Sequence, residues 1–277
     1  MKKSIIHMAF AVTVAGVTAT SVFAKANAVS TEQTDTSQKL VRIHEGLSSP
    51  VGMAYDTRGN LYVANWSAGT VLCFSPDGTR SVFAGGLHGP SGLAISQEGD
   101  LYVASYSDDL VWRFTPEGER SVFIRGLATP AGLSFDARGR LLIANRRTNQ
   151  ILAAHPDGKI EVVAEELQTP VGAVELPNGD LLVSNIEGGV SLVSGSLRAR
   201  TINSDLGSPG PGIVRAGTDA AYVVDYGGTT VSRIDRNGRR TVIADGLSSP
   251  VGLAQAPDGS LTVATWGANA TFHIPRP

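Results

Sequence analysis

A unit of about 40 residues recurs six times along this chain, and this repeat constrains the fold more than any other feature. Each unit opens with a leucine, which is followed by a proline and then by a glycine. The leucines are Leu47, Leu87, Leu127, Leu167, Leu206 and Leu247. Self-similarity at such a period is typical of architectures in which each unit packs on its neighbours.

Every unit contains short runs of alternating side chains, separated by turns rich in Gly, Pro and Asp. The run Leu61-Tyr-Val-Ala-Asn65 recurs as Leu101-Tyr-Val-Ala-Ser105. Four such strands fit one unit and indicate an antiparallel sheet. A sheet that is apolar on both faces needs a neighbour on each side, and a closed ring provides this for every unit. The sequence therefore predicts an all-β fold, a six-bladed β-propeller of four-stranded antiparallel blades.

The two ends of the repeat region predict how the ring closes. The last unit, which begins at Pro250, has room for three strands only. The segment Lys39–Leu47 aligns with Thr79–Leu87, which is the fourth strand of another unit. We therefore expect the N-terminal strand to complete the last blade by pairing with Thr271–Ile274. Residues 40–277 would then form one propeller domain.

Residues 1–28 have the pattern of a secretory signal peptide. Two lysines precede an apolar stretch, and small residues follow, so that cleavage is expected after Ala24 or Ala28. The short signal with its paired lysines is of a bacterial type and predicts export to the periplasm or the medium. We expect no membrane span in the mature chain. Residues 29–39 are polar and aperiodic, which is typical of a flexible leader.

Composition narrows the classes of partner. The chain has 23 basic and 25 acidic side chains, and the net charge of −2 argues against a nucleic-acid-binding surface spread over the protein. The single Cys excludes an intramolecular disulfide framework and a Cys-rich metal site. We expect a monomer that binds no nucleic acid.

The repeat also carries a resemblance to known families. The unit from Pro90 to Ser105, with Pro-Ser-Gly-Leu-Ala-Ile followed by Gly-Asp-Leu-Tyr-Val-Ala-Ser, resembles the NHL repeat and the repeats of SMP-30/gluconolactonase-like and streptogramin-lyase-like propellers. The resemblance extends from Leu40 to Ile274. It implies the fold but no single function, because these families include enzymes, sensors and binding modules. Streptogramin-lyase-like propellers have seven blades, one more than we count here.

Six polar residues end the second strands at the same position of each unit. They are Asn65, Ser105, Asn145, Asn185, Asp225 and Thr265. If these residues surround the central opening, their oxygen atoms suit a hard divalent cation such as Ca²⁺. Alternatively, each side chain caps its strand end and bonds the backbone of a nearby loop.

The resemblance to lactonase-like propellers implies a catalytic metal, held by a Glu and an Asn from first-strand loops and by an Asp at a second-strand end. Asp225 matches the last of these positions, and Asn145, Asn185 and Asn65 are candidate amide ligands. The loops before the first strands, such as Pro50-Val-Gly52, contain neither Glu nor Asn. This departure from the family pattern weakens the case for a catalytic metal.

The residues directly after the polar strand ends predict a ligand-binding site. They are Trp66, Tyr106, Arg146, Ile186, Tyr226 and Trp266. Aromatic rings at a concave opening suit sugar, peptide or aromatic ligands, and an arginine suits an anionic group. Because side chains alternate along a strand, these residues reach the opening only if the chain turns after the polar residue. Alternatively, the aromatic rings pack between blades.

Two functions follow from these features. The leading interpretation is an exported NHL-like binding module that holds a small-molecule or protein ligand at the central opening. The alternative is a metal-dependent lactonase or esterase of the SMP-30/gluconolactonase-like kind. His88 is the candidate base for such chemistry, but a lone base needs an orienting partner, and the sequence shows none.

Overall fold

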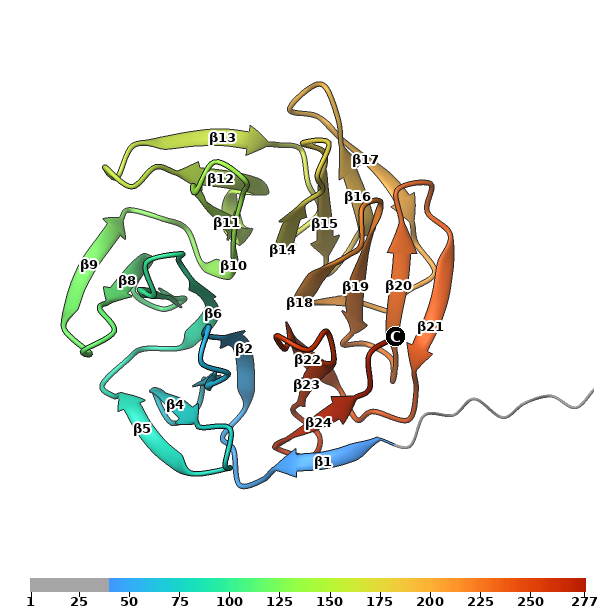
Figure 1. The fold of residues 1–277 in the computed structure, drawn as a ribbon. Helices are drawn as coiled ribbons and strands as arrows, with labels where there is room; N and C mark the ends of the chain where they lie inside the picture. The colour runs from blue at the N-terminus through green and yellow to red at the C-terminus, as the bar shows by residue number, and fades with distance from the viewer. Residues whose placement is uncertain (1–39) are drawn as a thin grey trace, which may run out of the picture. The chain divides into compact units, whose positions relative to one another are not determined.

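The computed structural model describes residues 40–277, so the expected signal peptide (1–28) and leader (29–39) lie outside the described residues. Six four-stranded antiparallel sheets are arranged in a ring (Figure 1). The predicted six-bladed β-propeller is therefore confirmed. Within residues 40–277, no helix has the length and apolar character that crossing a membrane requires.

The blades are numbered 1 to 6 in chain order, beginning with the blade that starts at Pro50. Each blade uses its four strands in sequence order from the centre outward, except blade 6. The innermost strands are β2 (Pro50–Tyr55), β6 (Pro90–Ile95), β10 (Pro130–Phe135), β14 (Pro170–Glu175), β18 (Pro209–Ala216) and β22 (Pro250–Gln255). The second strands are β3 (Leu61–Asn65), β7 (Leu101–Ser105), β11 (Leu141–Asn145), β15 (Leu181–Asn185), β19 (Ala220–Asp225) and β23 (Leu261–Thr265). The third strands are β4 (Thr70–Phe74), β8 (Leu110–Phe114), β12 (Gln150–Ala154), β16 (Gly189–Val193), β20 (Val231–Asp235) and β24 (Ala270–Ile274). The outer strands are β5 (Arg80–Ala84), β9 (Arg120–Arg125), β13 (Ile160–Ala164), β17 (Ala199–Asn203), β21 (Arg240–Ala244) and β1 (Val41–His44).

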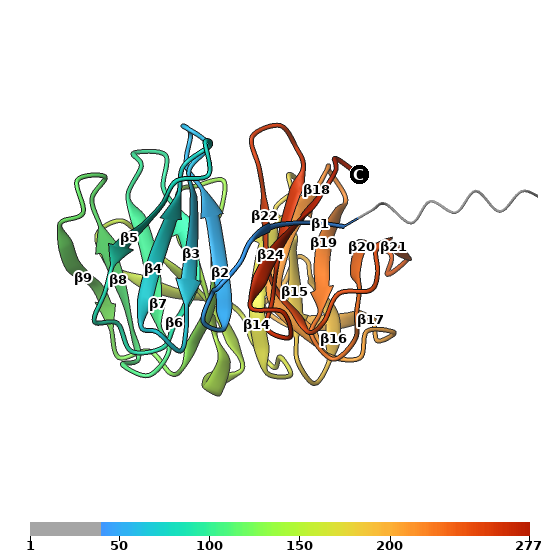
Figure 2. The same ribbon diagram turned by 90° about the horizontal axis from the view of Figure 1, so that it is seen from below.

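The ring closes as the sequence predicts. Strand β1 pairs antiparallel with β24, and the blade order is β1-β24-β23-β22. Figure 2 shows β1 running beside β24 at the junction with the first blade. His44 in β1 lies 2.8 Å from the Thr271 hydroxyl through Nδ1, and its ring stacks on Phe74 of blade 1 at 3.9 Å between centroids. The N-terminal strand thus joins the last blade to the first.

The hydrophobic core is divided into six clusters, and each lies between two adjacent blades. Strand β3 shows the cause, because its side chains alternate between two of these clusters. Leu61 and Val63 pack toward blade 6, whereas Tyr62 and Ala64 pack toward blade 2. A second strand is therefore buried on both faces, which explains why its residues are almost all apolar up to the polar end; the exceptions are Ser184 and Thr262.

A glycine at the third position of five inner strands, and at the fourth position of β18, lets neighbouring blades approach closely. These residues are Gly52, Gly92, Gly132, Gly172, Gly212 and Gly252. A Cβ atom at any of them would lie within 3.0 Å of the next inner strand, and the contact of Gly252 with Val51 closes the circle. The prediction that the Pro-x-Gly segments are loops is wrong, because these segments lie in the inner strands. Proline fits the first position because the ladder needs no N–H there.

Candidate functional site

The residues that follow the six second strands meet around one cavity of about 330 Å³. Five of them are the predicted ligand-binding residues Trp66, Tyr106, Arg146, Tyr226 and Trp266, and the sixth is Ile186. The rest of the wall comes from the starts of the inner strands, with Val51, Ser91, Ala131, Val171, Gly210, Pro211 and Val251. The structure therefore brings the predicted residues together, while their role in ligand binding stays a prediction.

A backbone hydrogen bond turns the chain at the end of the second strand. The N–H of Trp66 donates to the carbonyl of Ser49 at 3.1 Å, and the N–H of Trp266 donates to that of Ser249 at 3.0 Å. The same bond is present in every blade except the fifth. In these five blades the acceptor precedes the first-strand proline and has a left-handed φ between 49° and 62°; these residues are Ser49, Gly89, Thr129, Thr169 and Ser249. The turn expected from the alternation argument is therefore present.

The four aromatic residues form two pairs on adjacent blades. Trp66 and Tyr106 meet edge to face with centroids 4.9 Å apart, and Tyr226 and Trp266 do so at 5.4 Å. The indole Nε1–H of Trp266 donates to the carbonyl of Pro50 on the next blade at 3.0 Å. The rings therefore pack between blades and line the cavity at the same time, so both interpretations of the sequence describe part of their role.

The polar strand ends do not line this cavity. All six are buried, and four of them bond the loop before the inner strand of their blade. The Oδ1 atoms of Asn65 and Asn145 accept the backbone N–H groups of Ser48 and Ala128 at 3.1 and 2.7 Å. The carboxylate of Asp225 accepts the N–H groups of Gly207 and Ser208. This is the capping role that the sequence analysis gives as the alternative.

The four candidate metal ligands do not fit a cation site. Protein N–H groups already occupy the oxygen atoms of Asp225, Asn65 and Asn145. Asn185 is fully buried, and it donates to Ser191 and to nearby carbonyls while its Oδ1 has no partner. Among residues 40–277, no three His, Cys, Asp or Glu side chains form a group able to hold a metal ion. We therefore derive no chemistry from a metal at these positions.

His88 has the orienting partner that the sequence does not reveal. Its Nδ1 lies 2.9 Å from Oδ1 of Asp108, and Oδ2 of Asp108 accepts a hydrogen bond from Ser105 at 2.7 Å. These two hydrogen bonds hold the pKa of Asp108 below its ordinary value. The imidazole is exposed and does not line the cavity, but the adjacent Gly89 lies against the Trp66 ring. The pair therefore lies beside the rim of the pocket.

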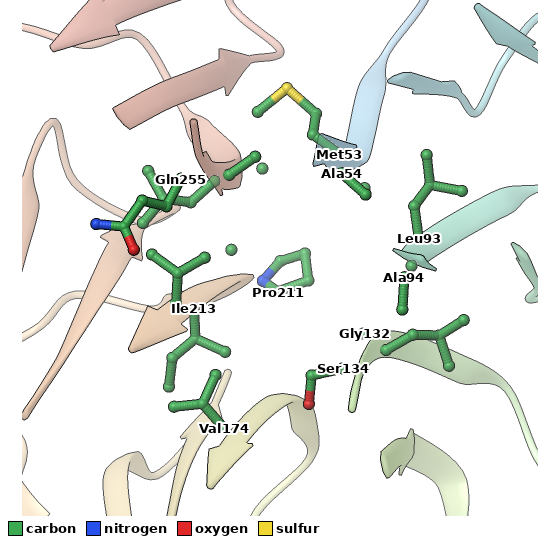
Figure 3. A pocket seen from close by; sticks show the side chains of 18 of the residues that line it. Met53, Ala54, Leu93, Ala94, Gly132, Ser134, Val174, Pro211, Ile213 and Gln255 are labelled. Carbon is green, nitrogen blue, oxygen red and sulfur yellow. The ribbon is translucent and has the colours of Figure 1, made fainter. Parts of the chain in front are cut away.

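A second cavity of about 320 Å³ lies along the same inner strands, past the start of each. Figure 3 shows Met53, Leu93 and Ile213 around its opening, with the ring of Pro211 toward the middle. Val51 and Pro211 line both cavities. Pro211 belongs to the eight-residue strand β18, which is the longest of the six inner strands. The extra length of this strand places Pro211 where the two cavities approach each other.

No protein-family model matches this sequence, and no curated protein matches it. Solved structures are similar in fold. A gluconolactonase of Xanthomonas campestris has a TM-score of 0.75 and 18% identity over 86% of this chain and 89% of that chain. A streptogramin B lyase has a TM-score of 0.65 and 15% identity over 85% and 96%. A virginiamycin B lyase of Staphylococcus aureus has a TM-score of 0.63 and 16% identity over 84% and 87%. At these identities the likeness shows a shared propeller fold.

Proposed function

We propose that this propeller is a small-molecule-binding module and that the cavity ringed by the second-strand ends is its binding site. The convergence of all six blades supports this proposal, because the same repeat position contributes one side chain from each blade. A volume of about 330 Å³ and a wall of apolar and aromatic side chains are typical of pockets for small ligands. Tyr226 and Trp266 remain 37% and 36% exposed, which leaves ring surface available to a ligand.

The three tryptophans of the chain provide a direct test. Trp66 and Trp266 line the cavity, whereas Trp112 lies in β8. In a Trp112→Phe variant, all indole emission therefore comes from the pocket. We expect a panel of sugars, short peptides, aromatic acids and aromatic alcohols to contain a compound that changes this emission saturably, and Tyr226→Ala to weaken the response. A panel without any saturable response would overturn the proposal.

Export is part of the proposal and is supported by the signal pattern of residues 1–28. Expression of the full chain in a bacterium should yield a mature protein whose first residue is Lys25 or Val29. N-terminal sequencing of the protein from the periplasm or the medium measures this. Recovery of the uncleaved chain in the cytoplasm alone would contradict export.

A second candidate function is hydrolysis of a lactone or an ester. The observation that favours it is the His88–Asp108 pair, because a carboxylate that accepts from Nδ1 leaves Nε2 free to act as a general base. The general similarity in fold to a gluconolactonase is compatible with this candidate. The donor set described above favours a metal-independent form of the reaction.

A screen of lactones and activated esters tests this second candidate. Any turnover should disappear in His88→Asn and persist in His155→Asn, because His155 lies at the end of β12 and contacts Glu161 instead. Turnover that survives His88→Asn would exclude the pair as its base. A screen without turnover would exclude hydrolysis of these substrates and leave the binding proposal intact.

A further inference from the structure

Among residues 40–277, Arg146 is the only charged residue that lines the proposed binding pocket. It begins the short helix η1 (Arg146–Thr148) directly after β11, so that a turn of fixed geometry holds its backbone. Its Nη1 donates a hydrogen bond to the hydroxyl of Tyr106 on the neighbouring blade, and its guanidinium carbon lies 5.9 Å from the centre of that ring. The guanidinium is therefore held at the wall of the pocket by an aromatic residue rather than by an acid.

Three other arginines of the described chain are part-buried, and all of them have their polar partners. Arg140 is paired with Asp136 and Glu161, and Arg233 is paired with Asp219. Arg240 has no carboxylate partner, but it donates from Nε, Nη1 and Nη2 to Ser232, to the carbonyl of Asp205 and to Thr230. Across residues 40–277, no carboxylate lies within 4.0 Å of the guanidinium of Arg146, and its Nε–H is buried without a partner. An anion that enters the pocket therefore gains a charge-assisted hydrogen-bond partner in this part-buried guanidinium, and it displaces no existing ion pair.

The remaining wall is poor in groups that recognise hydroxyls. The Nε1–H of Trp266 is used by Pro50, and the buried hydroxyl of Ser91 lies within hydrogen-bond distance of the carbonyls of Pro130 and Ala131. Apart from the hydroxyls of Tyr106 and Tyr226 and the Nε1–H of Trp66, the rest of the wall is the surface of aromatic rings and of aliphatic side chains. A sugar would lose its hydrogen bonds to water on entering this pocket and would gain few new ones. A flat apolar ligand, by contrast, packs well against such walls.

We propose that the pocket selects a flat apolar or aromatic molecule with a single carboxylate, and that Arg146 pairs with the carboxylate while the aromatic pairs hold the body. This inference rests on the proposed function, since it names the ligand class of the same pocket. Arg146 is then the residue that determines specificity for charge. Arg147, which follows it, is exposed and does not line the cavity, so it provides a matched control on the same turn.

Isothermal titration calorimetry with 2-naphthoate and with 2-naphthamide tests the inference, because the two probes share a ring system and differ in charge. In the native chain we expect the carboxylate to bind at least about tenfold more tightly, as charge-assisted hydrogen bonds are stronger than neutral ones. Arg146→Gln should reduce this ratio to near one, and Arg147→Gln should leave it unchanged. Arg146→Lys keeps the charge without the planar fork and should give an intermediate ratio.

The outcomes separate this inference from the proposed function. Equal affinity of the native chain for both probes would overturn the selection of an anion and leave the binding module standing. Glucose binding without binding of either naphthalene would overturn the ligand class and again leave the module. Loss of the ratio in Arg147→Gln would assign it to surface charge and overturn the role of Arg146. If Arg146→Gln does not fold, the ratio in the native chain and in Arg146→Lys still decides the result.

Discussion

Nδ1 of His88 lies 2.9 Å from Oδ1 of Asp108, and this contact joins two loops of the second blade. One loop leads into β6 and the other follows β7, the strand that ends at Ser105. The hydroxyl of Ser105 donates to the second oxygen of the same carboxylate at 2.7 Å. The three side chains therefore hold the rim of the pocket on the side of Trp66 and Tyr106.

The lowered pKa of Asp108 predicts a dependence of stability on pH. Hydrogen bonds from His88 and Ser105 cause the shift. A carboxyl group with a depressed folded-state pKa stabilises the fold above its unfolded pKa of about 4, and the contribution is lost as pH falls through the lower folded value. We expect Asp108→Asn to lower the melting temperature at neutral pH, and the difference from the native chain to shrink below about pH 4.

Thermal unfolding between about pH 2 and pH 7 measures this difference. Glu187→Gln is the control, since Glu187 is an exposed carboxylate that also follows a second strand. The interpretation fails if the deficit of Asp108→Asn is the same at every pH, because a contact independent of charge would then be responsible.

The close contacts at the inner-strand glycines predict that one added methyl group has a strong effect on stability. In Gly132→Ala, the new Cβ would lie within 3.0 Å of the Val171 carbonyl oxygen in the next blade. Because the neighbour is backbone and cannot move aside, we expect a loss of about 3 kcal/mol in the free energy of unfolding. Gly85→Ala is the matched control, since its Cβ would meet nothing within 4 Å. Urea unfolding measures both, and a small, equal effect would contradict the close approach of the inner strands.

Removal of β1 should open the ring. Deletion of residues 29–47 from the mature chain removes the strand that pairs with β24, together with the contact of His44 with Phe74 and the buried Leu47. We expect a loss of several kcal/mol, a large share of the roughly 5–15 kcal/mol of a typical domain. Deletion of residues 29–37 leaves β1 in place and should change little. Equal melting temperatures of the two truncations would show that β1 does not contribute to stability.

The repeat predicts the fold because each of its features reflects local structure within one blade. The period of the leucines gives the blade count, and the alternation in runs such as Leu61–Asn65 gives strands buried on both faces. The partial unit at each end gives the closure between β1 and β24. The pocket wall is also predictable, because residues at one repeat position of a ring must meet at one mouth.

The sequence offers both a capping role and a cation-binding role for the polar strand ends, but it could not decide between them, because the choice depends on side-chain direction at a turn. Sequence places Asp225 at a second-strand end, but only the structure shows its carboxylate bonded to the N–H groups of Gly207 and Ser208. The partnership of His88 with Asp108 is hidden for a similar reason, since the residues are 20 positions apart in different loops. A signal was present: Asp108 follows the polar strand end Ser105 by three residues, and is thus in reach of the preceding loop.

The capping role of Asp225 predicts that its loss affects stability. In Asp225→Asn, one acceptor oxygen becomes an NH₂ group that faces a backbone N–H, so we expect a loss of about 1–3 kcal/mol. Glu187→Gln removes the same charge from an exposed position and should be nearly neutral. Thermal unfolding with and without millimolar Ca²⁺ separates this role from a cation site. Stabilisation of the native chain that grows with the logarithm of calcium concentration and disappears in Asp225→Asn would contradict the capping interpretation.

The position of Pro211 predicts that this residue limits the depth of the pocket. Its ring contributes to the walls of both cavities, and it lies in the blade with the longest inner strand. In Pro211→Gly the ring is removed, so the cavity beside the aromatic pairs should extend toward the second one. We expect biphenyl-4-carboxylate, which is longer than 2-naphthoate, to gain affinity relative to 2-naphthoate in this variant. Pro76→Gly, in an exposed turn after β4, controls for the added backbone freedom. Calorimetry with both acids measures the ratio. An unchanged ratio in Pro211→Gly, with binding of 2-naphthoate retained, would show that Pro211 does not limit the depth of the pocket.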